Sequence, residues 1–128
     1  MNVPQNPLDW VTKAEEDFAV AHSILRRKKP LTAISCFHSQ QSAEKYLKAL
    51  LVERKRGFPK IHDLLKLLNL CETAGVLVPI DEDALDSLTK FAVVTRYPGN
   101  APSIEQAREA LETAKAVRKF ARKFLGIK

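Results

Sequence analysis

Apolar residues recur every three or four positions in successive segments of this chain, and prolines, glycines or capping residues separate the segments. This spacing places the apolar side chains of each segment on one face of an α-helix. The chain has little of the strict alternation that marks half-buried strands, and it contains only four glycines. The pattern therefore predicts an all-α protein, an antiparallel up-and-down bundle of about five helices with short connections.

The boundaries of the first two helices follow from these interruptions. Asn6 and Pro7 are residue types that cap and begin a helix, and this helix ends in a basic run before Pro30. The second helix is expected to run from Pro30 to about Arg54, because a glycine and a proline follow soon after.

The remaining three helices have similar signals. The third is expected around residues 61–74. The fourth begins after Asp81, which can cap it, and ends at residues 98–99, a proline followed by a glycine. Ser103 and Gln106 have the spacing of a capping box and begin the fifth helix.

A chain of 128 residues is the size of one domain, so we expect residues 1–128 to form a single helical domain. The N-terminus MNVPQNPLDW lacks the features of a signal peptide, and no apolar run is long enough to cross a membrane. We therefore expect a cytoplasmic protein with no membrane partner. Cys36 and Cys71 lie in apolar helical segments and are interpreted as packed thiols. No motif for a metal or an organic cofactor is present.

Basic residues exceed acidic ones and give a net charge of +6, which favours an acidic partner such as nucleotide or RNA. Much of the excess lies in three runs near predicted helix C-termini, where cations also stabilise the helix dipole. The runs are Arg26–Lys29, then Arg54–Arg56 with Lys60, and finally Arg118, Lys119, Arg122 and Lys123.

Alternating helix directions would bring the second and fourth connections to the same end of the bundle, with residues 26–29 and 76–80 at the opposite end. Arginine and lysine bind phosphate, and a tyrosine offers a surface on which a base can stack. Alternatively, Arg96 caps a helix and Tyr97 seals the end of the bundle. The candidate nucleotide- or RNA-binding residues are Arg54, Arg56, Lys60, His62, Arg96 and Tyr97.

Polar residues interrupt the apolar face of the second helix. Gln40 and Glu44 fall at its centre, with Gln41 and Lys48 at its edge. A buried carboxylate needs a cation or hydrogen-bond donors, and Lys48 is one turn from Glu44. His62 is not expected to reach Glu44, because about ten residues at about 1.5 Å each put it about 15 Å away. The four residues form either an intramolecular network or a dimer interface in which they fix register.

The runs CFHSQQSAEKYLKALL, FPKIHDLLKLL and RYPG, followed by a long last helix, resemble the HEPN domain. The resemblance extends from Leu8 to about Phe124. It implies a helical bundle that is commonly a homodimer, and stand-alone prokaryotic members are often encoded beside a minimal nucleotidyltransferase. It also supports the dimer-interface interpretation of four residues, Gln40, Gln41, Glu44 and Lys48.

The resemblance also implies a possible activity, since many HEPN proteins are metal-independent ribonucleases that use an arginine followed by a histidine. The family's arginine and histidine are separated by four to six residues, and here five residues separate Arg56 from His62. An arginine can hold the scissile phosphate, while a histidine can move the proton of a ribose 2′-hydroxyl. This chain departs from the usual form because Gly57 and Pro59 interrupt the helix between the two. Leu64 stands where some HEPN toxins have a tyrosine that their partner adenylylates.

The leading hypothesis is therefore a HEPN-type nucleotide- or RNA-binding protein that is the partner of a minimal nucleotidyltransferase, in a toxin–antitoxin-like pair. One alternative is a metal-independent ribonuclease toxin that uses Arg56 and His62. Another is a non-catalytic protein-interaction module. A neighbouring nucleotidyltransferase gene would favour the first two, but one chain does not show it.

Overall fold

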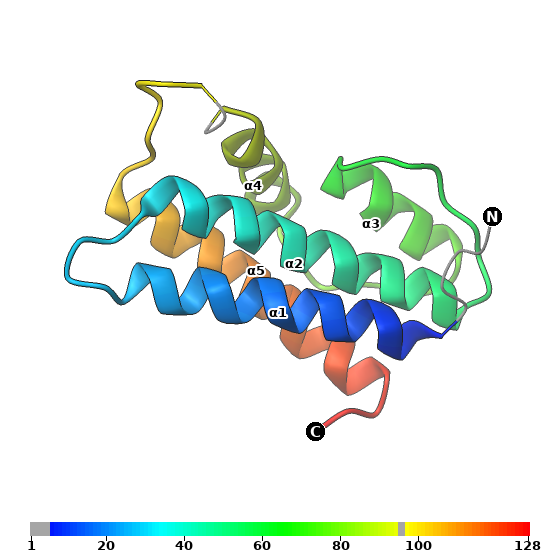
Figure 1. Cartoon of the computed structure of the whole chain (residues 1–128). Helices are drawn as coiled ribbons and strands as arrows, with labels where there is room; N and C mark the ends of the chain where they lie inside the picture. Colours follow the sequence, from blue (N-terminus) through cyan, green and yellow to red (C-terminus); the bar gives the residue numbers. More distant parts are fainter. Residues whose placement is uncertain (1–5, 95–96) are drawn as a thin grey trace.

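The computed structural model describes residues 6–94 and 97–128, and in these residues the chain forms five α-helices and no strand. Figure 1 shows them as a bundle around one central helix. This arrangement confirms the predicted all-α class and the number of helices. The helices are α1 (Pro7–Leu25), α2 (Thr32–Glu53), α3 (Leu64–Thr73), α4 (Glu82–Val94) and α5 (Ile104–Phe124).

The first and last helices begin at the capping residues that the sequence predicted, Asn6 and Ser103. The Asn6 Oδ1 atom accepts a hydrogen bond of 2.9 Å from the backbone N–H of Leu8. At α5, the Ser103 hydroxyl accepts from the Gln106 N–H, and the Gln106 side chain accepts from the Ser103 N–H. Both caps satisfy backbone donors that have no partner within the helix.

The starts of α2 and α3 lie slightly later than expected. α2 begins at Thr32, and its N-cap residue is Leu31, which makes no side-chain hydrogen bond to the first turn. α3 begins at Leu64 because Asp63 caps it, accepting a hydrogen bond of 3.0 Å from the Leu65 N–H. Residues 61–63, predicted as helix, therefore belong to the connection between α2 and α3.

α2 is the central helix, because it contacts each of the other four. Its large apolar side chains Tyr46, Leu47 and Leu50 are fully buried. α1 packs antiparallel to α2, as expected of successive helices with a short connection (Figure 1). The two helices approach closely at Ser35, a small residue whose hydroxyl donates to the Ala21 carbonyl at 2.9 Å.

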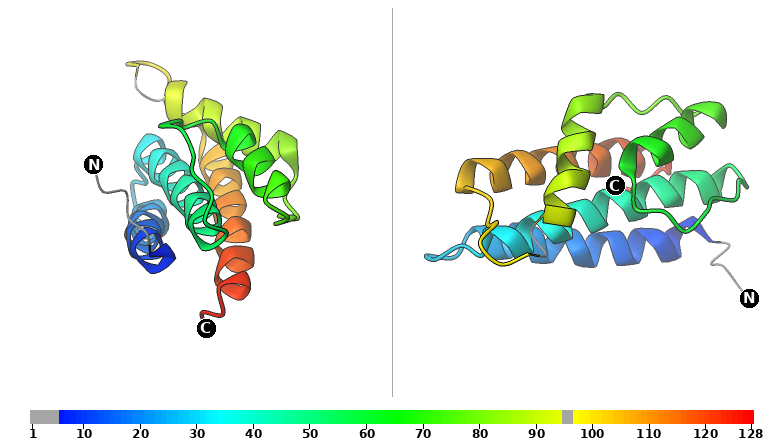
Figure 2. Two further views of the ribbon diagram at one scale, coloured as in Figure 1. Left: turned by 90° about the vertical axis from the view of Figure 1, so that its right-hand side faces the viewer. Right: turned by 90° about the horizontal axis from the view of Figure 1, so that it is seen from above.

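α3 runs in the same direction as α2, because the connection 54–63 turns back along α2 before α3 begins (Figures 1 and 2). The two C-terminal ends are joined directly, with Arg54 Nε donating to the Ala74 carbonyl at 3.1 Å. α4 then lies across the bundle, and α5 runs in the same direction as α2.

These directions overturn the expectation that the second and fourth connections share one end. Residues 97–102 lie beside the α1–α2 connection, whereas residues 54–63 begin at the opposite end, near the start of α1, and return from there along α2 (Figures 1 and 2). Residues 76–80 follow the C-terminal end of α3 and so lie near Arg54 rather than near residues 26–29. The reason is the turned-back connection and the crosswise α4, which break the alternation of direction.

A polar cluster connects α1, α2 and α5. Glu15 on α1 accepts hydrogen bonds from Arg118 Nε at 2.6 Å and Arg118 Nη2 at 2.9 Å, and a further one from the Tyr46 hydroxyl. Burial by itself raises the pKa of Glu15, but these hydrogen bonds and the charges of Arg118 and Arg122 outweigh it. The pKa therefore lies below its ordinary value of 4.5.

Three helices end in the same hydrogen-bonded turn, in which one residue adopts the left-handed conformation. At α3 and α5 this residue is a glycine, Gly75 with φ 86° and Gly126 with φ 73°. At α2 it is Lys55, with φ 56°. The Arg56 N–H donates to the Leu51 carbonyl at 2.9 Å and completes the turn. A residue with a Cβ atom is strained in this conformation, so Lys55 lowers the stability of the turn that follows α2.

Replacing Lys55 by glycine should raise the free energy of unfolding by about 0.5–1 kcal/mol, because glycine adopts this conformation without the strain of a Cβ atom. Urea unfolding followed by circular dichroism measures the change. Gly75→Ala is the matched control and should lower stability by about 1 kcal/mol. A loss of stability in Lys55→Gly would contradict the strain argument.

Replacing Glu15 by glutamine should lower the free energy of unfolding at pH 7 by about 1–3 kcal/mol, because Arg118 loses its anionic partner. A lowered pKa means that the Glu15 carboxylate stabilises the fold above its ordinary pKa of 4.5, and that this stabilisation is lost as the pH falls through the lowered value. Urea unfolding at pH 7 and near pH 3 should therefore show the two proteins converging in acid. A difference independent of pH would contradict this account.

Candidate functional site

A buried carboxylate lies at the centre of the polar residues on α2. Glu44 is 3% exposed, and its Oε2 atom is 2.9 Å from Lys48 Nζ, one turn along the helix. Gln40, one turn before it, donates to Oε1 at 3.1 Å. Gln41 joins the network by donating to the side-chain oxygen of Gln40 at 2.7 Å. The pairing with Lys48 expected from the sequence is thus confirmed.

His62 also contacts Glu44, and the expectation that it would lie too far away was wrong. Its Nδ1 atom is 2.8 Å from Glu44 Oε1. The side chain of Gln40 also donates to the His62 backbone carbonyl at 3.0 Å. That expectation assumed that the chain leaves α2 and does not return, whereas residues 54–63 turn back along the helix. Two contacts to α2 therefore fix the position of His62.

The imidazole of His62 combines a fixed orientation with access to solvent. Its side chain is 71% exposed, although the carboxylate that it contacts is buried. The Glu44 carboxylate accepts the hydrogen bond, so Nδ1 carries the proton and the neutral ring presents Nε2 as an acceptor. A buried carboxylate that orients a histidine in this way is an arrangement suited to proton transfer.

Two aromatic rings cover the amino group of Lys48. Its Nζ atom is 5.6 Å from the ring centre of Trp10 on α1 and 5.5 Å from that of Phe58 in the connection. The two rings contact each other edge to face with centroids 5.8 Å apart. Cation–π contacts of this kind partly compensate a desolvated ammonium group. They also attach the connection 54–63 to α1 and α2, and sequence reasoning had assigned no role to Trp10 or Phe58.

The polar residues of α2 therefore form an intramolecular network in this chain. Gln40, Glu44 and Lys48 are 2%, 3% and 6% exposed, so their side chains leave little surface for a second subunit. Gln41 is more accessible. A dimer interface at these residues stays a prediction, and any such interface would contact the residues that cover them.

The connection 54–63 presents exposed cations from this anchored position. Arg54, Arg56 and Lys60 are all exposed, and Arg54 is held by its hydrogen bond to Ala74. The acid within the segment is Asp63, whose carboxylate is occupied in capping α3. Arg56 and Lys60 are thus available to bind an anion, and they belong to the same connection as His62.

Tyr97, another predicted site residue, does not join this group. Tyr97 is exposed and follows the end of α4, and residues 97–102 lie beside the α1–α2 connection (Figures 1 and 2). The expectation that Tyr97 would lie next to His62 was therefore wrong. Arg96 lies outside the described residues.

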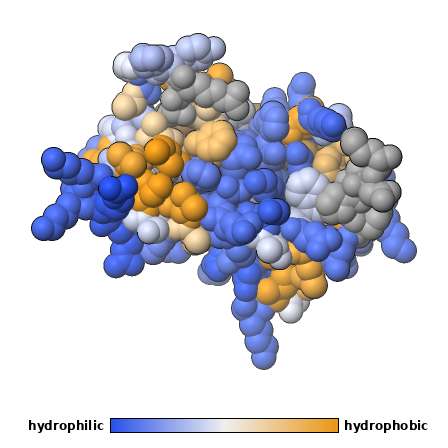
Figure 3. All heavy atoms as spheres, in the orientation of Figure 1, coloured by the Kyte–Doolittle hydropathy of each residue, from blue (hydrophilic) through white to orange (hydrophobic). Residues whose placement is uncertain are grey.

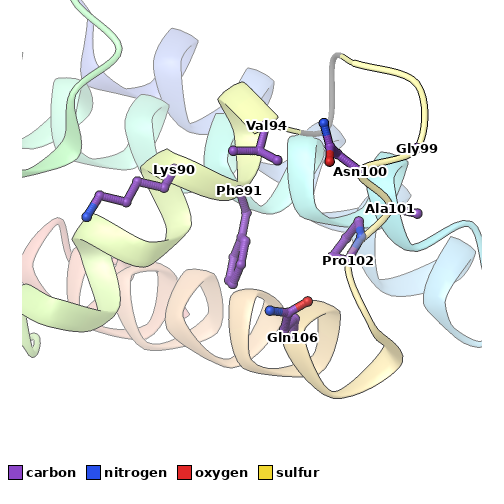
Figure 4. Close-up of a pocket in the computed structure, with 8 residues that line it drawn as sticks. All are labelled: Lys90, Phe91, Val94, Gly99, Asn100, Ala101, Pro102 and Gln106. Atoms are coloured by element: carbon purple, nitrogen blue, oxygen red, sulfur yellow. The ribbon is translucent and has the colours of Figure 1, made fainter.

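A separate pocket of about 340 Å³ lies between α4, α5 and residues 99–102. Figure 4 shows the Phe91 ring pointing from α4 toward Gln106 on α5. Lys90 is at its edge, 2.9 Å from the carboxylate of Asp86. The lining is mostly apolar and does not include His62 or the basic connection, so this pocket is distinct from the candidate site.

The described residues contain no group of three or more side chains that could hold a metal ion. Cys36 and Cys71 are unpaired and buried, as expected of packed thiols. Burial raises the pKa of Cys36 to about 11. Burial, with a smaller effect of Glu72, raises the pKa of Cys71 to about 12, so both thiols stay protonated at neutral pH. Among the described helices, none has the length and apolar character needed to span a bilayer.

Comparison with known proteins agrees with the fold. Residues 8–124 match the family model of the HEPN domain, and the chain belongs to this family. It is similar to the protein in the crystal structure of TT1696 from Thermus thermophilus, with 29% identity and a TM-score of 0.72. The match covers 91% of this chain and 96% of that one. A comparison with curated proteins found no match.

Replacing Glu44 by alanine should destabilise the protein far more than replacing His62 by alanine. The first change leaves the buried ammonium of Lys48 without its anion, at a cost of about 3–5 kcal/mol. The second removes a mostly exposed side chain and should cost about 1 kcal/mol or less. Urea unfolding measures both, and Glu44→Ala with Lys48→Met should recover part of the loss. Equal effects of the two single changes would contradict the proposed network.

Proposed function

We propose that this HEPN-domain protein binds nucleotide or single-stranded RNA through residues 54–63. The observation that supports this function is a basic connection held in place by the rest of the fold. Arg54 is hydrogen-bonded to Ala74, Phe58 packs on Trp10, and His62 contacts Glu44. Arg56 and Lys60 lie between these anchors and are exposed.

An anchored cationic segment suits a phosphate ligand for two physical reasons. Arginine and lysine make charge-assisted hydrogen bonds to phosphate oxygens, and contact with a polyanion releases its counterions. A segment already fixed by several contacts also loses less conformational entropy on binding than a free loop does. His62 adds a further polar contact for a phosphate, a ribose or a base edge.

The proposal extends to partners. Stand-alone HEPN proteins of prokaryotes, which this chain resembles, are often encoded beside a minimal nucleotidyltransferase and are commonly homodimers. We therefore propose that this protein is a cytoplasmic homodimer and the partner of such an enzyme in a toxin–antitoxin-like pair. Co-expression with a neighbouring nucleotidyltransferase, followed by purification of the complex, tests the partnership.

RNA cleavage is a second candidate function, and the contact between His62 and Glu44 favours it. In this reaction His62 Nε2 would remove the proton of a ribose 2′-hydroxyl, and the 2′-oxygen would attack the neighbouring phosphorus. The bond to the 5′-oxygen would break, and that oxygen would take up a proton from solvent water, leaving a 2′,3′-cyclic phosphate. Arg56 would stabilise the charge that develops on the phosphate. Glu44 would hold the imidazole in the required tautomer.

Replacing Arg56 or Lys60 by alanine should each weaken binding of a fluorescein-labelled oligouridylate by about 1–3 kcal/mol, because each change removes a charge-assisted contact. Added salt should weaken binding of the wild-type protein as well. Fluorescence anisotropy measures the affinities. Arg26→Ala with Arg27→Ala, at the opposite end of the bundle, is the control and should have much less effect. Equal losses from both ends would indicate diffuse attraction to a cationic protein and would contradict the site.

If the protein cleaves RNA, His62→Ala and Arg56→Ala should each abolish cleavage of single-stranded RNA while the helical spectrum is unchanged. Cleavage should survive EDTA, because the proposed chemistry uses only side chains. Gel analysis of a labelled oligonucleotide measures both effects. Wild-type protein that leaves varied RNAs uncut, with and without a nucleotidyltransferase, would remove this candidate and leave the binding function alone.

A further inference from the structure

Exposed apolar side chains gather at the end of the bundle where α2 begins. Of the eight large apolar side chains that are exposed in the described part of the chain, five lie here. They are Leu31 and Ile34 at the start of α2 and Val93, Val94 and Tyr97 at and just after the end of α4, together called the α2–α4 patch. The end of α4 lies over the first turns of α2 (Figures 1 and 2). Figure 3 shows apolar atoms gathered on this part of the surface.

The cations of Arg26–Lys29 lie next to this patch. All four residues are exposed, and none of the ion pairs formed by the described residues includes them. The sequence contains no acid between Asp17 and Glu44. Figure 3 shows hydrophilic side chains extending from the α1–α2 connection beside the apolar atoms. A molecule that covers the patch therefore meets a positively charged border.

The start of α2 strengthens the preference for an acidic partner. Its N-cap residue Leu31 makes no side-chain hydrogen bond, and its first turn contains no acid. The first N–H groups of a helix lack internal partners and carry a partial positive charge. A carboxylate from outside the chain could accept hydrogen bonds from them, as an aspartate does at an ordinary N-cap.

The pocket of Figure 4 adjoins the patch, because Val94 belongs to both. Phe91 and Pro102 give the pocket an apolar lining of a size that can hold one side chain. Interfaces gain most of their affinity from a few side chains buried in such pockets. The patch therefore combines a recess for an apolar anchor with a cationic border.

We propose that the α2–α4 patch docks an amphipathic segment of another protein, with apolar side chains on the patch and acidic side chains facing Arg26–Lys29 and the start of α2. A second copy of this chain is a poorer occupant, because it would bring a second cationic run to the same interface. Single-stranded RNA is also a poorer occupant, because four of the five patch residues are aliphatic and Tyr97 alone offers a surface for base stacking.

The test is selection from a displayed library of amphipathic helical peptides whose border positions are randomised. Selection uses the wild-type protein, with counter-selection against the variant carrying Ile34→Glu and Val93→Glu. Both positions are exposed, and an acid favours the first turn of α2 while it only slightly disfavours the last turn of α4, so this variant should keep its fold. Circular dichroism checks this. Leu77→Glu is the matched control, since Leu77 is 74% exposed and lies on the connection between α3 and α4.

Enriched peptides should carry aspartate or glutamate at the border positions. Their affinity, measured by fluorescence anisotropy, should fall at least about tenfold in the Ile34→Glu, Val93→Glu variant and in Arg26→Glu with Arg27→Glu. Leu77→Glu should leave it nearly unchanged. Enrichment of neutral or basic borders, or equal binding to all variants, would overturn the proposal.

Two further measurements distinguish the other occupants. A wild-type dimer that becomes a monomer in Ile34→Glu with Val93→Glu, detected by analytical ultracentrifugation, would assign the patch to a second copy and overturn the proposal. Oligouridylate binding that is lost in the same variant would assign it to RNA and also overturn it. Unchanged oligomeric state and unchanged RNA binding in this variant support a protein partner, independently of whether residues 54–63 bind RNA.

Discussion

The buried ion pair between Glu44 and Lys48 determines how the C-terminal end of α2 and its following connection are arranged. Removing a carboxylate and an ammonium group from water costs several kcal/mol for each ion, and their attraction alone offsets that cost only with good geometry and further hydrogen bonds. Here the further partners come from outside the ion pair. Gln40 and His62 donate to the carboxylate, and Trp10 and Phe58 cover the ammonium group.

These partners come from three parts of the chain, so the ion pair organises more than α2. Trp10 belongs to α1, while Phe58 and His62 belong to the connection that returns along α2. Satisfying the buried charges therefore requires the connection to turn back, and this turn sets α3 parallel to α2. The same requirement fixes His62 with its Nδ1 atom occupied and most of its ring accessible. The contact between His62 and Glu44 thus both satisfies the buried carboxylate and orients the imidazole for a potential chemical role.

The two ends of the bundle differ in character as a result. At the end where α2 finishes, the cations of residues 54–60 lie on a segment that several side-chain contacts hold in place. At the other end, the cations of Arg26–Lys29 border exposed aliphatic side chains and a helix start without a side-chain cap. Phosphate recognition suits the first surface, and contact with an acidic, partly apolar protein suits the second. Two of the three basic runs of the sequence therefore lie on surfaces with different chemistry.

The amino-acid sequence by itself determined the helices, because apolar spacing and capping residues act over one or two turns. It identified the Asn6 and Ser103 caps, the all-α class, the pairing of Glu44 with Lys48, and the resemblance to the HEPN domain that the family match confirms. It also named Arg56, Lys60 and His62 as candidate binding residues. Only the tertiary structure decided which of these residues meet. Helix directions depend on the path of the connections, and the sequence of residues 54–63 does not reveal that they return along α2. For this reason the distance from Glu44 to His62 was overestimated, and residues 97–102 were expected near the end of α2, although they lie beside the α1–α2 connection. Local signals depend on neighbours in sequence, whereas a buried charge is satisfied by whichever groups the whole fold brings to it.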